Sequence, residues 1–239
     1  MRVVGFVASL VALGCSLVGT RARAQTFIPG SWRLTQYWIA QEAPSPEDRG
    51  VVRILDRSGS TLTWACRRFA SALAMEGTGR TWDGRLFNWA SRENGHACYL
   101  EVDPGLYPYG IGVRGYALVP FRSLAVDSRF IPIGRTVELA ELVGMILPDG
   151  TRHDGCFVAV DGGGAIRGHH IDLFVPSRDH YVSLSRAGVL PEEVHAAIDS
   201  PRCAHASRFA VTPIPGAPAG DRRAHDPRHL VLPPSRVAD

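Results

Sequence analysis

The chain has 239 residues, of which 45% are hydrophobic and 21% charged, a composition typical of one sizeable folded domain with appendages. Its 25 Gly and 17 Pro favour a fold rich in turns, and all 26 basic residues are Arg. The formal net charge of +3 includes three Arg that lie before residue 25, so the remaining chain balances 23 basic with 23 acidic residues. This balance gives no indication of a nucleic-acid partner.

Residues 1–24 are predicted to be a signal peptide. Arg2 precedes an apolar run, and Ala22 and Ala24 form the small-x-small pattern that favours cleavage after Ala24. The run is too short for a membrane-spanning helix, and we expect no such segment after signal removal. The competing interpretation is a lipoprotein signal cut before Cys15. In both cases the protein is exported, to the periplasm, the outer membrane surface or the medium.

The N-terminal half is predicted to form short strands and one helix. Residues 28–47 predict an early strand followed by a loop, and residues 51–55 predict a second strand. Residues 65–75 have apolar side chains at helical spacing and favour a short helix. Asp83-Gly84 lies between apolar segments and predicts a hairpin.

Short apolar runs alternate with turns from about residue 97 to 175. These runs are Cys98–Val102, Gly115–Val119, Leu124–Val126, Thr136–Leu139, Gly144–Leu147, Phe157–Val160 and Ile171–Val175. Many short strands with close turns are typical of an all-β barrel or sandwich.

The C-terminal region predicts a helix and a tail. Residues 191–198 begin with Pro191 and carry Glu192 and Glu193, which are favoured in the first turn of a helix. Residues 204–239 are rich in Pro and Arg and predict a disordered tail.

Four cysteines remain after the signal peptide. An even number in an exported chain predicts two disulfides, for which three pairings exist. We favour Cys66–Cys98 and Cys156–Cys203. The sequence has no C-x-x-C pair and its His residues are scattered, so no metal site is expected.

Three aspartates, Asp127, Asp161 and Asp172, each end or interrupt an apolar strand. One such Asp is usually a turn former, but three beside Gly-rich turns predict a shared site. Asp161 and Asp172 are 11 residues apart, close enough to share a pocket in which burial and like charge raise the pKa of a carboxyl group. A carboxylic acid of this kind can protonate the leaving oxygen of a glycosidic bond.

The segments around these aspartates carry a specific pattern. Residues 125–134 read AVD-x-x-x-IP-x-G, residues 161–168 read D-x-GGAI-x-G, and residues 170–174 read H-x-D-x-F. Over about residues 115–176 this pattern resembles the three-aspartate (3D) domain, which is similar to the catalytic barrel of the membrane-bound lytic transglycosylase A family. Gly162 departs from the Thr or Val that many relatives have there, which adds backbone freedom beside Asp161.

The resemblance implies a fold and an organisation. It implies a mainly β protein with a six-stranded double-psi β-barrel at residues 111–200 and a short C-terminal helix. Residues 25–110 would form a β-rich extension packed on the barrel.

The resemblance also implies an activity. The protein would be a lytic transglycosylase that cleaves the MurNAc-GlcNAc β-1,4 bond of peptidoglycan glycan strands to a 1,6-anhydro product, as a monomer without a cofactor. Asp172 would be the acid/base, supported by Asp161 and Asp127. The implied substrate-binding residues are Gly163, Gly164, Ala165, His170 and Thr78. Glu76 could be a second acid or a solvated turn residue, and the turn residue is the favoured interpretation.

Two other functions stay open at this point. One is a non-catalytic glycan-binding barrel similar to expansin modules, and the other is an ordinary glycoside hydrolase using Asp161 and Asp172 as its carboxylate pair. Product mass separates the two enzymes, because hydrolysis adds water and the anhydro route does not.

Overall fold

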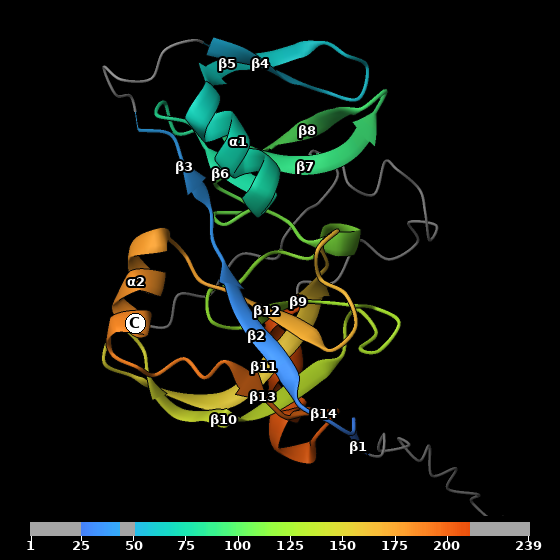
Figure 1. Cartoon of the computed structure of the whole chain (residues 1–239), viewed down its shortest axis with the longest axis vertical. Coiled ribbons are helices and arrows are strands. Elements are labelled where there is room, and N and C mark those ends of the chain that lie inside the picture. The colour runs from blue at the N-terminus through green and yellow to red at the C-terminus, as the bar shows by residue number, and fades with distance from the viewer. Residues whose placement is uncertain (1–24, 44–50, 211–239) are drawn as a thin grey trace, which may run out of the picture.

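The computed structural model describes residues 25–43 and 51–210. Figure 1 shows a mainly β molecule in which two sheets form two lobes. The predicted signal peptide, Cys15 and residues 211–239 of the predicted tail lie outside the described residues. No helix in the described part of the chain is both long and apolar enough to cross a membrane.

The larger sheet contains eight strands in the order β1-β14-β10-β11-β9-β12-β2-β13. Their bounds are Thr26–Phe27 (β1), Trp32–Tyr37 (β2), Ser123–Val126 (β9), Thr136–Ile146 (β10), Arg152–Asp161 (β11), His170–Phe174 (β12), Glu193–Val194 (β13) and Ala196–Ile198 (β14). β13 and β14 lie toward opposite ends of this order, yet only His195 separates them in the chain. The sheet therefore curls until its two ends approach each other. The expected six-stranded double-psi connection stays a prediction.

The two faces of this sheet contact different cores. Leu124, Val126, Ile171 and Leu173 lie inside the curled sheet. The alternate residues face outward, because successive side chains of a strand point to opposite faces. Among them, Ala125 and Phe174 join a second buried cluster that also contains Leu86, Val102 and Tyr107 of the other lobe. The outer face of the curled sheet thus packs against the N-terminal lobe.

The N-terminal lobe is a six-stranded sheet with one helix. Its strands, in the spatial order β3-β6-β7-β8-β4-β5, have the bounds Ala40–Gln41 (β3), Val51–Leu55 (β4), Thr61–Cys66 (β5), Thr78–Arg80 (β6), Leu86–Glu93 (β7) and His96–Val102 (β8). The strand predicted at residues 51–55 and the hairpin around Asp83-Gly84 are confirmed. Two residues join β2 to β3, so one nearly continuous segment runs through both lobes (Figure 1).

Helix α1, Arg67–Glu76, confirms the helix predicted at residues 65–75. The Cys66 sulfur accepts a hydrogen bond from the Phe69 N–H at its start, and Gly77 ends it in the left-handed conformation with φ 79°. Phe69 and Leu73 are buried against the sheet. A side chain on Gly79 of β6 would approach both to 2.9 Å, so this close packing requires glycine.

The helix predicted at residues 191–198 is wrong. This segment forms β13, which pairs with β2, and β14, which pairs with β1 and β10. Eight residues form only two helical turns, and isolated helices of that length are marginal in water. Pairing with the edges of β2 and β10 satisfies the same backbone groups and buries Val194 and Ile198 as well.

Three more segments differ from the expectations. Residues 115–119 contain no strand, only the short turn η1 (Val113–Gly115) and a single bridge between Ile111 and Ala117. The two runs predicted between residues 136 and 147 form one long strand, β10. Helix α2, Arg178–Arg186, which Ser177 caps, was not predicted from the sequence.

One of the two predicted disulfides is present. Cys156–Cys203 is confirmed, whereas the Cys66–Cys98 pairing is wrong because both are free thiols. Cys66 pairs with Val51 at one end of β4, and Cys98 pairs with Leu55 at the other end. Four residues of strand span about 13 Å, well beyond the roughly 7 Å between Cα atoms that a disulfide tolerates.

The confirmed disulfide attaches a C-terminal helical segment to the larger sheet. This segment, η2, covers Pro201–Phe209, so residues 204–209 of the predicted tail are part of the fold. Arg202 pairs with Glu138 of β10, and His205 bonds Asp154 of β11.

Candidate active site

Strand register brings Asp161 and Asp172 to the same level of the larger sheet. Asp161 on β11 and Asp172 on β12 both pair with Ala125 on β9, the strand between them. Thr35 on β2 is in turn the register partner of Asp172. Asp172 and Phe174 are two residues apart on β12, so both point to the outward face of the larger sheet. Thr35 and Tyr37 lie on that face of β2 for the same reason. The site therefore lies where the curled sheet meets the N-terminal lobe.

Asp172 is a largely buried carboxyl group bonded to a hydroxyl. The Thr35 Oγ1 hydroxyl lies 2.8 Å from its Oδ1 and 2.7 Å from His170 Nε2. Burial raises the pKa of Asp172 to about 6, although the Thr35 hydrogen bond and the Arg33 charge lower it. A group with this pKa exchanges its proton close to neutral pH, as an acid/base must.

Asp161 has a similar environment. The Tyr37 hydroxyl donates to its Oδ2 at 3.0 Å, and the Gly162 N–H donates to its Oδ1 at 2.8 Å. Burial raises the pKa of Asp161 to about 6, and the negative charge of Asp172 adds to this shift. Burial and the two aspartates also raise the pKa of Tyr37 well above its ordinary value. Gly162 has no side chain, but its N–H bonds Asp161.

Glu76 is a third carboxyl group of this cluster. It is the last residue of α1, and its Oε2 accepts the Trp38 N–H at 3.1 Å. Burial raises its pKa to about 7, and the charge of Asp172 contributes. The favoured interpretation of Glu76 as a solvated turn residue is therefore wrong. Asp172 interacts with both Asp161 and Glu76, which makes it the central member.

Asp127 does not belong to this cluster. Its buried carboxylate accepts hydrogen bonds from the Arg129 guanidinium and from the Gly168 N–H at 2.9 Å. These bonds hold the pKa of Asp127 well below its usual range. They also tie the turn after β9 to the residues that lead into β12. This placement supports a structural role.

The residues implied to bind substrate are divided between two places. Gly163, Gly164 and Ala165 form an exposed turn between β11 and β12, and His170 contacts Thr35 beside Asp172. Thr78 is buried in the N-terminal lobe, where its hydroxyl accepts a hydrogen bond from Asn88. Its side chain therefore has no exposed group for a glycan.

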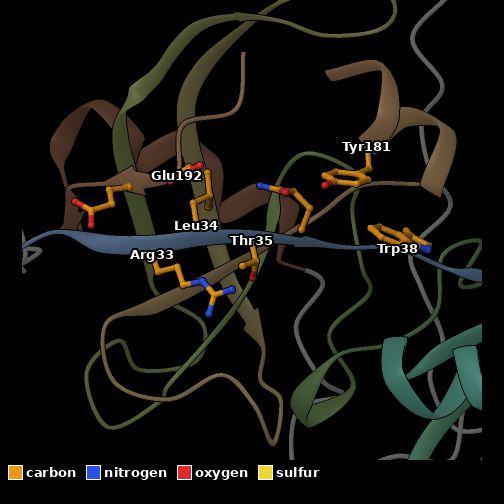
Figure 2. Close-up of a pocket in the computed structure, with 8 residues that line it drawn as sticks. Arg33, Leu34, Thr35, Trp38, Tyr181 and Glu192 are labelled. Carbon is orange, nitrogen blue, oxygen red and sulfur yellow. The ribbon is translucent and has the colours of Figure 1, made fainter. Parts of the chain in front are cut away.

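A pocket of about 630 Å³ lies along β2 (Figure 2). The residues that line it are Arg33, Leu34, Thr35, Gln36, Trp38, Tyr181, Glu192 and Glu193. The Trp38 and Tyr181 rings stack on each other at 5.2 Å between centroids. Thr35 bonds Asp172 and the Trp38 N–H bonds Glu76, so two pocket residues contact the carboxyl cluster directly.

Residues 122–198 match the family model described as the 3D domain. This region is a 3D domain. The match confirms the resemblance carried by the three aspartate motifs, and it contains all three aspartates.

Several solved structures that are similar to about 70% of this chain are bacterial lytic transglycosylases. Escherichia coli MltA with bound chitohexaose shares 16% identity over 71% of each chain, with a TM-score of 0.49. A membrane-bound lytic murein transglycosylase from Agrobacterium tumefaciens shares 13% identity over 73% of this chain and 74% of its own, with a TM-score of 0.46. LtgG of Burkholderia pseudomallei shares 17% identity over 70% and 71%, with a TM-score of 0.42. No curated protein matches the sequence.

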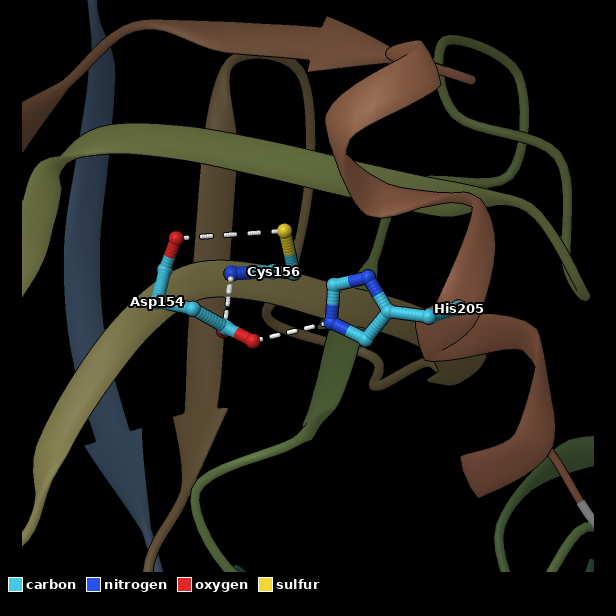
Figure 3. Close-up of side chains that lie close together, drawn as sticks. All are labelled: Asp154, Cys156 and His205. Atoms are coloured by element: carbon cyan, nitrogen blue, oxygen red, sulfur yellow. Dashed lines mark hydrogen bonds and ion pairs between the residues drawn. The ribbon is translucent and has the colours of Figure 1, made fainter.

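A second polar cluster, between β11 and η2, gathers Asp154, Cys156 and His205 (Figure 3). Its ligand atoms lie within 4.8 Å of one another. The Cys156 sulfur, however, is already in the disulfide, and the Asp154 carboxylate is paired with Arg122 and His205. The cluster fixes η2 on the 3D domain, and its cysteine sulfur is not a free thiolate that could bind a metal ion.

Three site residues were not predicted from the sequence as partners of the aspartates. Thr35, Tyr37 and Glu76 all lie outside the 3D domain, in the N-terminal part of the chain. Thr35 and Tyr37 are polar residues at alternate positions of a strand whose Trp32 and Leu34 are buried. That alternation was the available signal, but it does not say which distant strand lies beside β2.

Proposed function

We propose that this protein is an exported peptidoglycan lytic transglycosylase that cleaves the MurNAc-GlcNAc β-1,4 bond and forms a 1,6-anhydro product. The central position of Asp172 in the carboxyl cluster carries the proposal: it is largely buried, accepts a hydrogen bond from Thr35, and its charge raises the pKa of Asp161 and of Glu76. The 3D-domain match supports the same reaction class. A six-stranded double-psi connection of the barrel is part of the proposal.

Asp172 acts as the only obligatory acid/base. It first gives its proton to the glycosidic oxygen of the leaving sugar, and the bond from that oxygen to the anomeric carbon breaks. The 6-hydroxyl of the same MurNAc then attacks the anomeric carbon and gives its proton to the Asp172 carboxylate. The enzyme regains its proton and no water is consumed.

Asp161 and Tyr37 assist this reaction electrostatically. An ionised Asp161 stabilises the positive charge that develops at the anomeric carbon, and the Tyr37 hydroxyl holds its carboxylate in place. The turn at Gly163, Gly164 and Ala165 contacts the glycan strand, and the pocket along β2 receives a neighbouring sugar or its peptide stem.

Product analysis of the mature protein tests the proposal. Digestion of purified peptidoglycan should release fragments with the mass of 1,6-anhydro products. Asp172→Asn keeps the size of the side chain but cannot donate the proton, so the rate should fall by about 100-fold or more. Asp149→Asn, in an exposed turn after β10, is the matched control and should cleave normally.

Other outcomes point to the alternatives. Fragments that are heavier by one water would indicate a hydrolase, in which Glu76 or Asp161 serves as the second carboxyl group. Peptidoglycan binding without any cleavage would indicate a binding module. Normal turnover by Asp172→Asn would move the acid role to Asp161 or Glu76.

A further inference from the structure

The pocket along β2 lies at an edge of this strand. Arg33 and Thr35, which line the pocket, belong to the outward face of β2. Leu34 and Gln36 line it as well, and they belong to the opposite face. Figure 2 shows Arg33 and Leu34 on opposite sides of the β2 ribbon. Because residues of both faces line the pocket, it runs along the edge of the strand.

The main chain of Gln36 faces this edge. On the other edge of β2, the Arg33 N–H bonds the carbonyl of the residue before β12 at 3.0 Å, and the Tyr37 carbonyl accepts from the residue after β12 at 2.9 Å. Alternate residues of β2 therefore use their main-chain groups to pair with β12. The N–H and C=O groups of successive strand residues point to opposite edges, so those of Gln36 point toward the pocket.

On this edge the neighbours of Gln36 have partners for their N–H groups. The Leu34 N–H donates to the Glu192 carbonyl at 2.8 Å, and the Trp38 N–H donates to Glu76 Oε2 at 3.1 Å. Within the described residues, neither the N–H nor the C=O of Gln36 has a hydrogen-bond partner on this edge. Free main-chain groups of this kind bind an incoming extended peptide, one residue of which pairs with both groups.

The open edge of β2 is short. β13 covers the edge at Trp32 and Arg33, and the stacked rings of Trp38 and Tyr181 stand at the other end. The distance from Leu34 to Trp38 is four residue steps, about 13 Å. A peptide of about four residues fits this length. A longer strand from a second copy or another protein would meet β13 at one end and the two rings at the other.

We propose that the open edge of β2 binds a peptide stem of peptidoglycan as a short extended chain that pairs with the Gln36 main chain. This inference rests on the proposed function, which brings the glycan strand to Asp172. Thr35 is the register partner of Asp172, so the edge lies directly beside the acid/base. A chain paired with Gln36 lies two interstrand steps from β12, about 9–10 Å from the Asp172 Cα atom. About three residues of a stem attached to a sugar at Asp172 reach across that distance.

The charges in the pocket suit such a peptide. Arg33 and the acids Glu192 and Glu193 line the end next to β13. A stem carries carboxylate and amino groups, which these side chains attract. The rings of Trp38 and Tyr181 offer an apolar wall at the opposite end. A bare sugar supplies neither charged groups nor a main-chain N–H and C=O pair for Gln36.

Binding of glycan strands by Asp172→Asn tests the proposal without cleavage. Strands with stems should bind at least about 10-fold more tightly than strands from which an amidase has removed the stems. In the same background, Gln36→Pro removes the N–H but leaves the β12 ladder intact, so affinity for stem-bearing strands alone should fall by about 3- to 10-fold. Gln36→Ala removes the side chain but keeps the donor, so the preference should remain.

Amide hydrogen exchange gives a second measurement that does not depend on the folding of Gln36→Pro. In Asp172→Asn, stem-bearing strands should slow exchange of the Gln36 N–H, and bare strands should not. Equal affinity for the two kinds of strand, an unprotected Gln36 amide, or full preference in a folded Gln36→Pro protein overturns the proposal. If stems protect Gln36 but the wild type cleaves no glycan, the proposed function alone fails. Cleavage without this protection overturns the stem-binding inference alone.

Discussion

Asp161 and Asp172 are carboxyl groups in surroundings that disfavour their charge. Each has a pKa raised from 3.8 to about 6, chiefly by burial. At pH values between 3.8 and about 6, each of these carboxyl groups is protonated in the folded protein but ionised in the unfolded chain. The free energy of unfolding therefore falls as pH rises from about 4 to 6 and stays reduced at neutral pH. The site is maintained at a cost in stability.

Asp161→Asn should restore part of the free energy of unfolding that is lost at neutral pH. We expect the variant to be more stable than the wild type at pH 7 by on the order of 2–3 kcal/mol and nearly equal to it at pH 4. It should also lower the pKa of Asp172, because the repulsion between the two carboxylates is mutual. Denaturant unfolding at both pH values measures this. A variant that is less stable at pH 7 would mean that the Tyr37 hydrogen bond outweighs the burial of charge.

The sequence predicted the aspartates but not their partners, for a physical reason. Asp161 and Asp172 interrupt apolar strands close together in the chain, so local pattern and spacing reveal them. Tyr37 lies 124 residues from Asp161 and Thr35 lies 137 residues from Asp172. Their contacts depend on which strands become neighbours, and no local pattern in β2 carries that information.

At the scale of elements, the end of β11 depends on the loop before η1. A side chain at Gly112 would come within 2.4 Å of the Val160 carbonyl oxygen and 3.2 Å of the Asp161 Cβ atom. The adjoining Val113 backbone also lowers the pKa of Asp161. The loop and the strand end therefore fix the Asp161 carboxyl group together, and glycine is what allows their close approach.

Gly112→Ala should displace Asp161 and reduce glycan cleavage by about 100-fold, since a shift of about 1 Å in a catalytic group has an effect of that size. Gly105→Ala, in an exposed turn, is the control and should retain activity. Melting temperatures of both variants distinguish displacement from unfolding. Normal cleavage by a folded Gly112→Ala protein would show that Asp161 tolerates movement.

Element prediction succeeded where local signals agreed with the tertiary environment. In α1, apolar spacing and the packing of Phe69 and Leu73 favour the same helix. At residues 191–198, Pro191 and the following acids favour a helix start, but the open edges of β2 and β10 offer strand pairing. The tertiary contacts decide the structure there, as they do for other short segments with weak local preference.

At the scale of the whole molecule, the Cys156–Cys203 disulfide closes a segment that contains the β11–β12 turn, α2, β13 and β14. The bonded residues are 47 positions apart, and a cross-link of that span stabilises a fold by about 4 kcal/mol in the chain-entropy model. Around it, Arg122 contacts the Phe209 ring and Arg202 pairs with Glu138. The bond thus holds η2 on the sheet that carries Asp161.

A double variant, Cys156→Ala with Cys203→Ala, should lose about 4 kcal/mol of unfolding free energy. A reducing agent should destabilise the wild type to a similar extent and leave the double variant unchanged, because Cys66 and Cys98 are free. Thiol labelling of the unfolded, non-reduced protein should find these two thiols. A further loss of stability when the double variant is reduced would contradict the structure.

The position of β9 has a consequence for how this site can diversify. Because Asp161 and Asp172 both pair with Ala125, their Cα atoms stand two interstrand steps apart, about 9–10 Å. The intervening turn at residues 162–169 does not set that distance. Insertions or deletions in the turn can therefore reshape the contacts with a bound glycan while the separation of the two carboxyl groups is inherited unchanged. Substrate preference and bond cleavage are thus open to independent variation in this architecture.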